Sequence, residues 1–530
     1  MQEAEKTLLK VEHLQIGFRE RKKMNVVVKD VSFSVKEGEI LGIVGESGSG
    51  KSMTALSILG LLSKEAKLVN GNIIFEDKEL YHCTKKEFCK IRGNDISMIF
   101  QEPMTSLNPV MKIGSQIEEM LLLHSSINET ERKQKVLDIL EEAGLQNSEL
   151  LIGKYPHQLS GGMRQRVMIA MAMVMKPKLL IADEPTTALD VTVQEQILKL
   201  IQRFNKEYKT AVIFISHDLG IIKNLCHRAI VMCNGFIEEE GSIQKIFENP
   251  ESEYTKKLLS AVPGRDRINQ FEQQEDEIQA ASITEQKQAL EVKQLNGFYL
   301  EQKNLFGQNA KKKILDNISF SVAQGEIVGI VGESGCGKST LAKAVLGLLE
   351  QTEGTIHTFG ERPAMVFQDP FSSLNPTKKI KWLMEEPLKL KGGFSKQQRQ
   401  QKIMEMLKEV GLEEEHMNRY VSELSGGQRQ RVSIACALIT NSRLVVLDEP
   451  VSALDVTIQA QILKLLLKLR KTFDLSYVFI SHDLNVVYQM CDRICVMYQG
   501  KMIEIAERQE LFENPKEEYT RKLLSAIPWI

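Results

Sequence analysis

The chain has 530 residues, of which 42% are hydrophobic and 26% are charged, and its net charge of −2 gives no electrostatic reason to expect a nucleic-acid partner. It contains no run of 18 apolar residues, so we expect no membrane-spanning segment. Residues 1–6 lack the basic region and apolar core of a signal peptide, so the protein is expected to remain in the cytosol.

The first predicted elements lead to a glycine-rich loop. Residues 8–14 alternate in polarity, and the apolar run 40–44 has the length of a fully buried strand. This run opens directly onto residues 45–52, Gly-Glu-Ser-Gly-Ser-Gly-Lys-Ser, and then onto a helical stretch. A strand, a glycine-rich loop and a helix in this order are the context of a phosphate-binding loop. Residues 332–339, Gly-Glu-Ser-Gly-Cys-Gly-Lys-Ser, repeat the pattern.

The residue types in this loop fit phosphate binding. Backbone N–H groups must approach phosphate oxygens closely, and the helix start adds a favourable dipole. Lys51 and Lys338 are expected to reach the β- and γ-phosphates, and Ser52 and Ser339 to bind Mg²⁺. A single such motif could be an ordinary glycine-rich turn, but two copies in the correct context favour the binding function. The glycines assigned to the cradle are Gly45, Gly48, Gly50, Gly332, Gly335 and Gly337.

Two carboxylates follow the apolar run 179–182. The run predicts a buried central strand, so Asp183 and Glu184 are expected at the carboxyl edge of the sheet, where ligands bind in open α/β folds. Asp183 is expected to hold Mg²⁺ through water, and Glu184 to polarise the attacking water. Asp448 and Glu449 repeat this arrangement. Without the upstream loops, an acidic turn after a strand would be the simpler interpretation.

Three further motifs occur once in each half of the chain. An apolar strand is followed by a glutamine, an eight-residue stretch reads Leu-Ser-Gly-Gly-x-Arg-Gln-Arg, and a later strand is followed by Ser-His-Asp. The motif serines, aspartates and histidines are each 265 residues apart, but the loop lysines are 287 apart and the glutamines 267. This register indicates a duplication. The second copy lacks 20 residues, which correspond to a peripheral loop or helix near residues 75–95.

This set of motifs, in this order, resembles the nucleotide-binding domain of the ATP-binding cassette (ABC) superfamily over nearly the whole chain. The resemblance implies an α/β fold with two tandem P-loop NTPase domains, each with a mostly parallel sheet core, an antiparallel β subdomain and a helical subdomain. We expect these domains at residues 1–263 and 290–530. The stretch 264–289 is polar and poor in aromatic residues, so it is expected to be a flexible linker.

The resemblance also assigns roles to the repeated polar residues. The glutamines correspond to the residue that senses Mg²⁺ and the attacking water, and the histidines to the switch residue that contacts the γ-phosphate of ATP. The expected catalytic residues are Glu184, His217, Gln101, Glu449, His482 and Gln368. The expected Mg²⁺ ligands are Ser52, Gln101, Asp183, Ser339, Gln368 and Asp448.

The Ser-Gly-Gly motif is predicted to begin a helix, with serine as its cap and an anion site at its amino terminus. In the ABC family this site faces the γ-phosphate bound to the opposite domain. Two composite sites are therefore expected, completed by Ser160, Gly161 and Gly162 in one case and by Ser425, Gly426 and Gly427 in the other. Met163 replaces the commoner glutamine of the motif.

Two other pairs of residues have assignments from the same resemblance. Asp190 and Asp455 match the D-loop, which crosses to the partner domain. Phe18 and Tyr299 are candidates to stack on adenine, although an aromatic residue at a strand end is as often part of the core. The eight cysteines fit no zinc-ligand spacing and are expected to be reduced, structural thiols.

Within the superfamily, two function classes remain open. The extensions after Gln101 and Gln368 and the domain ends at 246–263 and 511–528 resemble the peptide/nickel importer family. That family implies two transmembrane permease subunits and an extracytoplasmic solute-binding protein as partners, with the chain on the cytoplasmic face of the membrane. Small peptides are the leading cargo, and nickel or a metal chelate is the runner-up. The alternative is a soluble ABC-F-type ribosome-associated ATPase, but the acidic, Gln-rich linker lacks the positive charge that RNA binding needs.

Overall fold

The computed structural model describes residues 6–20, 23–102, 106–187, 189–261, 287–301, 310–452 and 454–527. The chain divides into two compact units, one built mainly from residues before 262 and the other mainly from residues after 263. The expected linker lies mostly outside the described residues. The first described strand of the second unit, β11, begins at Gln288, inside the range expected for the linker.

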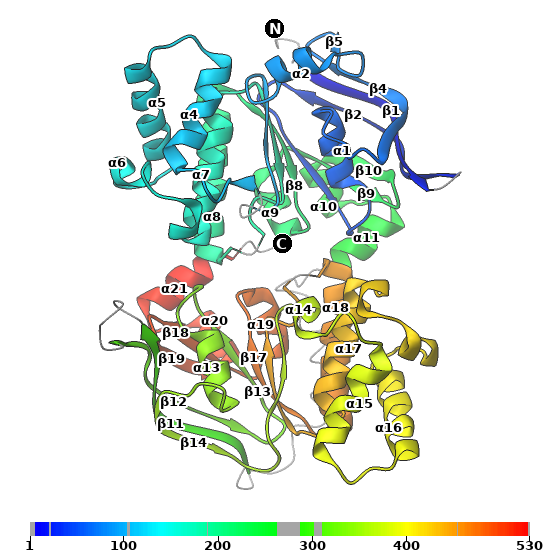
Figure 1. Cartoon of the computed structure of the whole chain (residues 1–530), viewed down its shortest axis with the longest axis vertical. Helices are drawn as coiled ribbons and strands as arrows, with labels where there is room; N and C mark the ends of the chain where they lie inside the picture. The colour runs from blue at the N-terminus through cyan, green and yellow to red at the C-terminus, as the bar shows by residue number, and fades with distance from the viewer. Residues whose placement is uncertain are drawn as a thin grey trace. The chain divides into compact units, whose positions relative to one another are not determined.

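The first unit contains two sheets (Figure 1). Within the described residues, an antiparallel sheet has the order β2-β1-β4-β5, and a six-stranded sheet has the order β10-β9-β3-β8-β7-β6. In the second sheet, the neighbouring strands β9, β3, β8, β7 and β6 are parallel to one another, and β10 is antiparallel to β9. The strands are β1 Thr7–Glu20, β2 Lys23–Lys36, β3 Ile40–Gly45, β4 Ala66–Phe75, β5 Lys78–Glu79, β6 Ile96–Ile99, β7 Leu179–Asp183, β8 Ala211–Ile215, β9 Arg228–Cys233 and β10 Phe236–Ser242.

Burial on both faces explains the apolar runs in the sequence. Every residue of β3, β7 and β8 is buried. One face of the parallel sheet packs with the antiparallel sheet and α1, and the other face packs against helices. Strands covered on both faces need continuous apolar sequence rather than alternation.

The helices of the first unit surround this sheet. Figure 1 draws α4, α5 and α7 side by side at one end of the unit, away from the antiparallel sheet. The described helices are α1 Lys51–Ile58, α2 Lys85–Ile91, α4 Ile113–His124, α5 Glu129–Glu142, α6 Ser148–Leu151, α7 Gly161–Met173, α8 Val191–Tyr208, α9 Leu219–Leu225, α10 Ile243–Glu248 and α11 Glu253–Ser260, with a 3₁₀ turn at Pro156–Gln158.

The second unit repeats this architecture. Within its described residues the sheet orders are β12-β11-β14 and β15-β16-β17-β13-β18-β19. Its strands are β11 Gln288–Glu301, β12 Ala310–Ala323, β13 Ile327–Val331, β14 Thr352–Thr358, β15 Ala364–Val366, β16 Leu444–Asp448, β17 Ser476–Ile480, β18 Arg493–Tyr498 and β19 Lys501–Glu507. Its helices are α13 Lys338–Val345, α14 Pro370–Ser373, α15 Ile380–Lys391, α16 Lys396–Glu409, α17 Gly426–Leu438, α18 Val456–Phe473, α19 Leu484–Met490, α20 Arg508–Glu513 and α21 Glu518–Ser525, with 3₁₀ turns at Glu414–Asn418 and Val421–Glu423.

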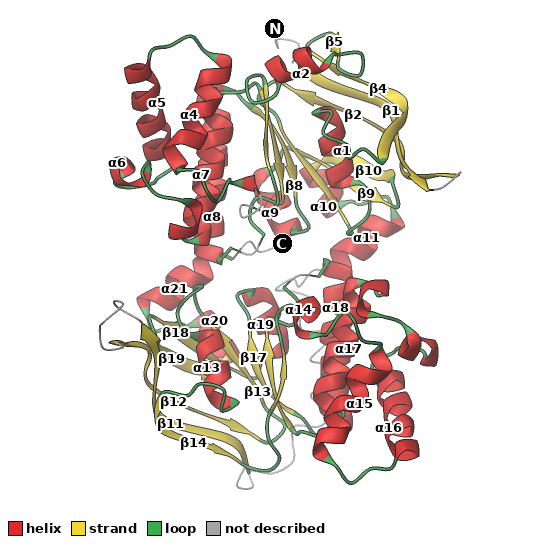
Figure 2. Cartoon of the chain, viewed as in Figure 1, coloured by secondary structure: helices red, strands yellow, loops and turns green. Residues whose placement is uncertain are grey.

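Each unit therefore has the predicted parallel core, antiparallel sheet and group of helices (Figure 2). The helix of each Ser-Gly-Gly motif begins at the first glycine, Gly161 or Gly426, with the preceding serine as its cap, as predicted. The helical stretch predicted after the first phosphate loop is α1, which ends at Ile58.

The 20-residue difference between the copies is located in one place. In the first unit, β5 and α2 lie between β4 and β6, whereas in the second unit β14 leads to β15 through residues 359–363. Helix α2 is capped by Thr84, whose hydroxyl accepts a hydrogen bond from Glu87 N, and the helix carries Phe88 and the exposed Cys89. Arg92 ties its end to the loop after α1, with Nε 2.7 Å from Leu59 O. The predicted peripheral helix is confirmed.

The cysteines are free thiols. Cys226 and Cys491 are buried at equivalent positions, and their Sγ atoms lie 3.0 and 2.8 Å from the position that a Cβ on Gly42 or Gly329 would take. A small side chain is therefore needed on each strand facing the thiol. No helix in the described part of the chain is both long enough and apolar enough to cross a membrane.

Candidate nucleotide-binding sites

The phosphate loops begin where the central strands end. Gly45 and Gly332 both have φ +150°, and a Cβ at these positions would lie 2.1 Å from Met232 O or 2.2 Å from Met497 O. The next strand of the sheet therefore excludes any side chain at the first loop position. Gly48 has φ +79° and no neighbour within 4 Å of its Cβ position, so this part of the loop faces open space, as a phosphate cradle requires.

The loop lysines are buried and lie over the loop. Lys51 Nζ donates to Gly45 O at 2.8 Å and to Glu46 O at 2.9 Å. Lys338 Nζ makes the same two contacts in its own loop, at 2.7 and 3.0 Å. Each lysine is the first residue of the following helix, so its ammonium group lies beside the amide groups of the helix start. This arrangement concentrates positive charge where the predicted phosphates would bind.

A serine and an aspartate meet beside each loop. Ser52 Oγ is 3.1 Å from Asp183 Oδ1, and Ser339 Oγ is 3.4 Å from Asp448 Oδ1. Burial raises the pKa of both aspartates, while the serine hydroxyl groups lower it. Hydroxyl and carboxylate oxygens are the hard ligands that Mg²⁺ prefers, so this donor set fits the ion.

In the first unit, three side chains converge on one carboxylate oxygen. Glu184 Oε2 lies 3.0 Å from Gln101 Nε2, 3.3 Å from His217 Nδ1 and 2.9 Å from Thr187 Oγ1. Burial raises the pKa of Glu184, but the contacts with His217 and Thr187 outweigh burial and hold the pKa at about 2. The carboxylate therefore stays ionised at neutral pH, as a group that orients water must.

The second unit has the same arrangement around Glu449. Its Oε2 lies 2.8 Å from Gln368 Nε2 and 3.1 Å from His482 Nδ1. Burial raises the pKa of Glu449, and the contact with His482 lowers it below its ordinary value. Burial lowers the pKa of His482, but Glu449 raises it above the ordinary value. Ser452 replaces the threonine here, and its hydroxyl donates to the main-chain oxygen of Glu449 at 3.2 Å.

The two central glutamates have strained backbones. Glu184 has φ +47° and Glu449 has φ +49°, in the left-handed region that residues other than glycine seldom adopt. Each is held there by its own N–H group, which donates to the last residue of the neighbouring strand, Ile215 O at 3.0 Å or Ile480 O at 2.9 Å. The strand end therefore fixes the direction of the carboxylate.

The Ser-Gly-Gly motifs begin helices as predicted. Ser160 Oγ accepts a hydrogen bond from Met163 N at 3.3 Å, and Gly161 and Gly162 are the first residues of α7. Ser425 makes the same cap with Gln428 N at 3.3 Å, and Gly426 and Gly427 begin α17. The Gln428 side chain also accepts from Ser425 N at 3.0 Å, which completes a capping box that Met163 cannot make.

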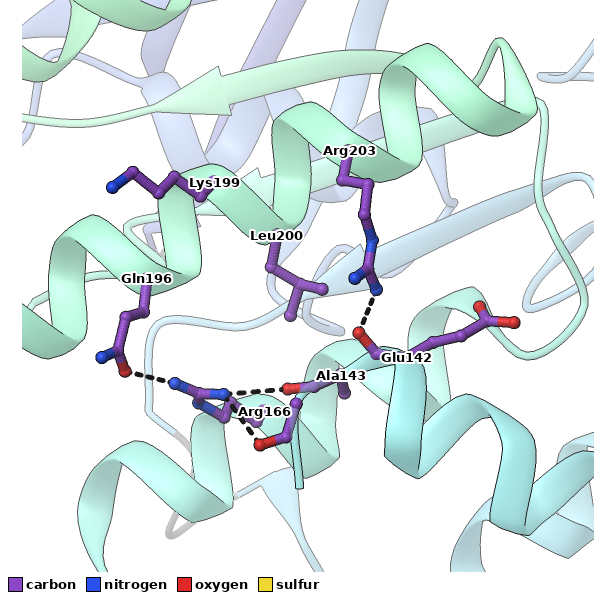
Figure 3. Close-up of a pocket in the computed structure, with 8 residues that line it drawn as sticks. Glu142, Ala143, Arg166, Gln196, Lys199, Leu200 and Arg203 are labelled. Atoms are coloured by element: carbon purple, nitrogen blue, oxygen red, sulfur yellow. Dashed lines mark hydrogen bonds between the residues drawn. The ribbon is translucent and has the colours of Figure 1, made fainter. Parts of the chain in front are cut away.

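Helix α7 is anchored to α5 through Arg166. Its Nη1 donates to Ala143 O at 3.2 Å and to Gly144 O at 3.1 Å, at the carboxyl end of α5 (Figure 3). Arg166, Gln196 and Arg203 are among the residues that line a pocket of about 410 Å³ between α5, α7 and α8. None of the predicted nucleotide-site residues lines this pocket. The Arg166 guanidinium group at the carboxyl end of α5 therefore has a structural role.

Comparison with known proteins identifies the family to which the chain belongs. Residues 28–187 and 315–452 match the sequence profile described as ABC transporter, and residues 239–288 and 503–530 match that of the oligopeptide/dipeptide transporter C-terminal region. The first profile alone covers more than half of the chain. The chain belongs to the ATP-binding proteins of ABC transporters. It is an ATPase with two fused cassettes.

Two similar proteins match the chain over nearly its whole length. The chain is 41% identical to the glutathione import ATP-binding protein GsiA of Escherichia coli O6:H1, over 98% of this chain and 89% of that protein. It is 43% identical to the ABC transporter ATP-binding protein YejF of Escherichia coli K12, over 98% of this chain and 99% of that protein. The structure of an archaeal ribosome recycling factor, aABCE1, in complex with stalk protein aP1 covers 90% of this chain and 87% of that chain, with a TM-score of 0.59 and 21% identity, and this likeness concerns the fold alone.

The structure brings most of the predicted residues of each cassette together, but not the aromatic pair. Phe18 is half-buried and packs against the core beneath the antiparallel sheet, whereas Tyr299 is 39% exposed. Adenine stacking by either residue stays a prediction. Asp190 and Asp455 directly precede α8 and α18. The composite pairing across the two cassettes also stays a prediction.

Sequence reasoning missed three side chains that contact the residues of the candidate sites. Thr187 and Ser452 lie three residues after the glutamates that they contact, and a hydroxyl at that spacing in both copies was the available signal. Tyr519 contacts the second phosphate loop from the end of the chain. Tyr519 belongs to a Tyr-Thr pair that occurs in both domain ends, at 254–255 and 519–520, within the ranges that resemble the importer family.

Proposed function

We propose that this ATPase is the energy-coupling subunit of an importer for small peptides, bound peripherally on the cytoplasmic face of the membrane. The observation that carries the proposal is the match of both cassettes to the C-terminal region of oligopeptide/dipeptide transporters. The identity to a glutathione import protein supports the same cargo class, because glutathione is itself a small peptide. Two permease subunits and an extracytoplasmic solute-binding protein are the partners that this function needs.

Each cassette has the residues for one hydrolytic site. Lys51 or Lys338 neutralises phosphate charge, and the loop amide groups orient the triphosphate. Ser52 and Asp183 in the first cassette, and Ser339 and Asp448 in the second, would hold Mg²⁺, which would supply positive charge to offset the charge that develops on the phosphates. Glu184 or Glu449, ionised and held by its histidine and glutamine, orients the attacking water.

We further propose that the serine and glycines of each motif complete the site of the other cassette. ATP would then favour a closed state, because it contacts both cassettes only in that state. Small-angle scattering of the Glu184→Gln/Glu449→Gln chain should give a smaller radius of gyration with Mg-ATP than with ADP. Equal radii would contradict the closure.

The cargo proposal is tested by reconstitution. The chain and two candidate permeases are placed in liposomes, and ATP hydrolysis is measured with the solute-binding protein loaded with dipeptide, tripeptide, glutathione or nickel chelate. We expect a peptide to stimulate hydrolysis several-fold, and the Glu184→Gln/Glu449→Gln chain to give no response. Stimulation by the metal chelate alone would overturn the peptide assignment, and a requirement for ribosomes would overturn the transport assignment.

A further inference from the structure

The Tyr-Thr pairs near the end of each cassette lie on short helices that a buried glutamate anchors. In the second cassette, Glu504 of β19 is 7% exposed, and its two carboxylate oxygens accept from Lys516 N at 2.8 Å and Glu517 N at 3.2 Å. These amides lie just before α21. Burial raises the pKa of Glu504, but its hydrogen bonds hold the net pKa below the ordinary value. The ionised carboxylate therefore caps the start of α21 and fixes the helix to the sheet.

Helix α21 brings a tyrosine to the phosphate loop. The Tyr519 hydroxyl oxygen accepts a hydrogen bond from Glu333 N at 3.1 Å, although 186 residues separate the two. The next side chain, Thr520, is fully buried, which sets the rotation of α21 about its own axis. The ring of Tyr498 packs against the ring of Tyr519, with centroids 4.3 Å apart. The hydroxyl group is thus held by packing from two directions.

The contacted peptide group belongs to the working part of the loop. Glu333 is the second loop residue, and its carbonyl oxygen accepts from Lys338 Nζ at 3.0 Å. Its N–H group is the one that Tyr519 binds, so both sides of this residue's backbone have a partner. Further along the loop, Cys336 O accepts from Gly500 N at 2.9 Å. The loop is therefore held at both ends by the strand–helix segment that closes the cassette.

In the first cassette the equivalent tyrosine lies close to the equivalent loop residue, but with a geometry less favourable for a hydrogen bond. Glu239 anchors α11 as Glu504 anchors α21, accepting from Glu251 N at 2.8 Å and Ser252 N at 3.1 Å. The hydroxyl oxygen of Tyr254 is also buried, and its neighbours are the main chain of Glu46, which corresponds to Glu333, and the side chain of Cys233. Cys233 replaces the second tyrosine ring at this position, so less ring packing orients Tyr254.

We propose that Tyr519 is a positioning residue of the second ATP site, holding Glu333 so that the phosphate loop is ordered before ATP binds. This inference rests on the proposed function, in which the loop binds ATP. When a binding-competent loop is only partly populated, the apparent dissociation constant rises by the inverse of that population. Loss of one hydrogen bond to a main-chain amide therefore corresponds to about a 3- to 10-fold weaker ATP site.

The test uses full-length chains in which one site is first emptied. Lys51→Ala leaves the second site and Lys338→Ala leaves the first, and binding of Mg-AMP-PNP is measured by titration calorimetry. In the Lys51→Ala chain, Tyr519→Phe should raise the dissociation constant about 3- to 10-fold. In the Lys338→Ala chain, Tyr519→Phe should leave it unchanged. Tyr254→Phe is the matched control and should shift neither site by more than about twofold.

Steady-state kinetics separate positioning from a merely structural role. Tyr519→Phe retains the ring contact and should raise the KM for ATP with kcat within about twofold, because the bound triphosphate itself orders the loop. Glu504→Gln loosens α21 without touching Tyr519 and should shift binding at the second site in the same direction, whereas Glu239→Gln should not shift the first site.

The outcomes are distinct. A lower melting temperature with unchanged AMP-PNP affinity and unchanged KM would overturn the positioning role. If Tyr254→Phe weakened nucleotide binding at the first site as much as Tyr519→Phe weakens it at the second, the difference between the two cassettes would be overturned. If the two lysine variants did not each remove one equivalent of bound nucleotide, the ATP sites themselves, and not Tyr519, would be wrongly assigned.

Discussion

The two cassettes place the same reactive groups with different supports. In each, a glutamine and a histidine contact one oxygen of the glutamate that follows a buried strand. The hydroxyl beside that glutamate differs: Thr187 donates to the carboxylate, whereas Ser452 donates to the main-chain oxygen and also contributes to lowering the pKa of the Glu449 carboxyl group. The helices that follow the Ser-Gly-Gly motifs, α7 and α17, also differ, because Gln428 makes a capping box at α17 that Met163 cannot make at α7.

This comparison separates what the chemistry requires from what the fold leaves free. Glutamate, histidine and glutamine are placed by strand ends, whose positions follow from the sheet. The supporting residues lie on loops and helix starts, where several side chains serve the same purpose. We therefore expect the two sites to share a mechanism and to differ in affinity and rate.

The largest effect is expected from the central glutamates. Glu184→Gln and Glu449→Gln should each lower single-turnover hydrolysis at their own site by about 10²-fold or more, because the neutral amide no longer polarises water. Binding of Mg-ATP should persist, since the phosphate cradle is unchanged, and fluorescent-nucleotide titration is the control. A variant that retained near-full activity would mean that its site is degenerate and that the cassettes are not equivalent in mechanism.

The first loop glycine should be more sensitive than the second. Gly45→Ala and Gly332→Ala place a Cβ against the carbonyl of the next strand and should destabilise their cassettes by about 2–4 kcal/mol. Gly48→Ala meets no neighbour and should cost only about 1 kcal/mol, from its left-handed backbone. Thermal denaturation of the three variants tests the order. Equal losses at Gly45 and Gly48 would contradict the packing explanation.

A smaller, pH-dependent effect is expected from the histidine–glutamate pair of the second site. The raised pKa of His482 gives stability that is complete below the histidine's unfolded value and lost as pH rises through its folded value. The lowered pKa of Glu449 gives stability present above its unfolded value and lost as pH falls through its folded value. His482→Gln should therefore lower the melting temperature by a few degrees most strongly between about pH 4.5 and 6.5. A difference that grew above pH 8 would contradict the ion pair.

The smallest effect is expected at the amino-terminal ends of α7 and α17, the helices that follow the Ser-Gly-Gly motifs. Met163→Gln should complete the capping box at α7 and stabilise the first cassette by about 0.5 kcal/mol, and Gln428→Met should cost the second cassette about as much. Differential scanning calorimetry of both variants measures the shifts. Stability changes of opposite sign in the two variants would show that the capping box distinguishes the two helices. A destabilising Met163→Gln would mean that packing around the methionine outweighs the cap.

The sequence predicted those parts of the sites that depend on local order along the chain. Lys51 follows a strand and a glycine-rich loop, and Glu184 follows an apolar run, so the sheet edge brings them together in any fold of this class. The contact between Tyr519 and Glu333 joins segments 186 residues apart and leaves no periodicity in the sequence. Gly45 was explained by the approach of phosphate, but the carbonyl of Met232 excludes a side chain there as well. Such contacts depend on how distant strands pack.

The extra helix of the first cassette makes the two halves chemically distinguishable to a reagent. Of the eight cysteines, all within the described residues, Cys89 on α2 is the exposed one, and the second cassette has no counterpart of α2. A thiol-reactive dye should therefore couple first to one known half of an otherwise repeated chain. A label on Cys89 of α2 and a second label on a cysteine introduced into the second cassette would allow the distance between them to be followed by energy transfer. The position of the first label would be known without further separation of the labelled products.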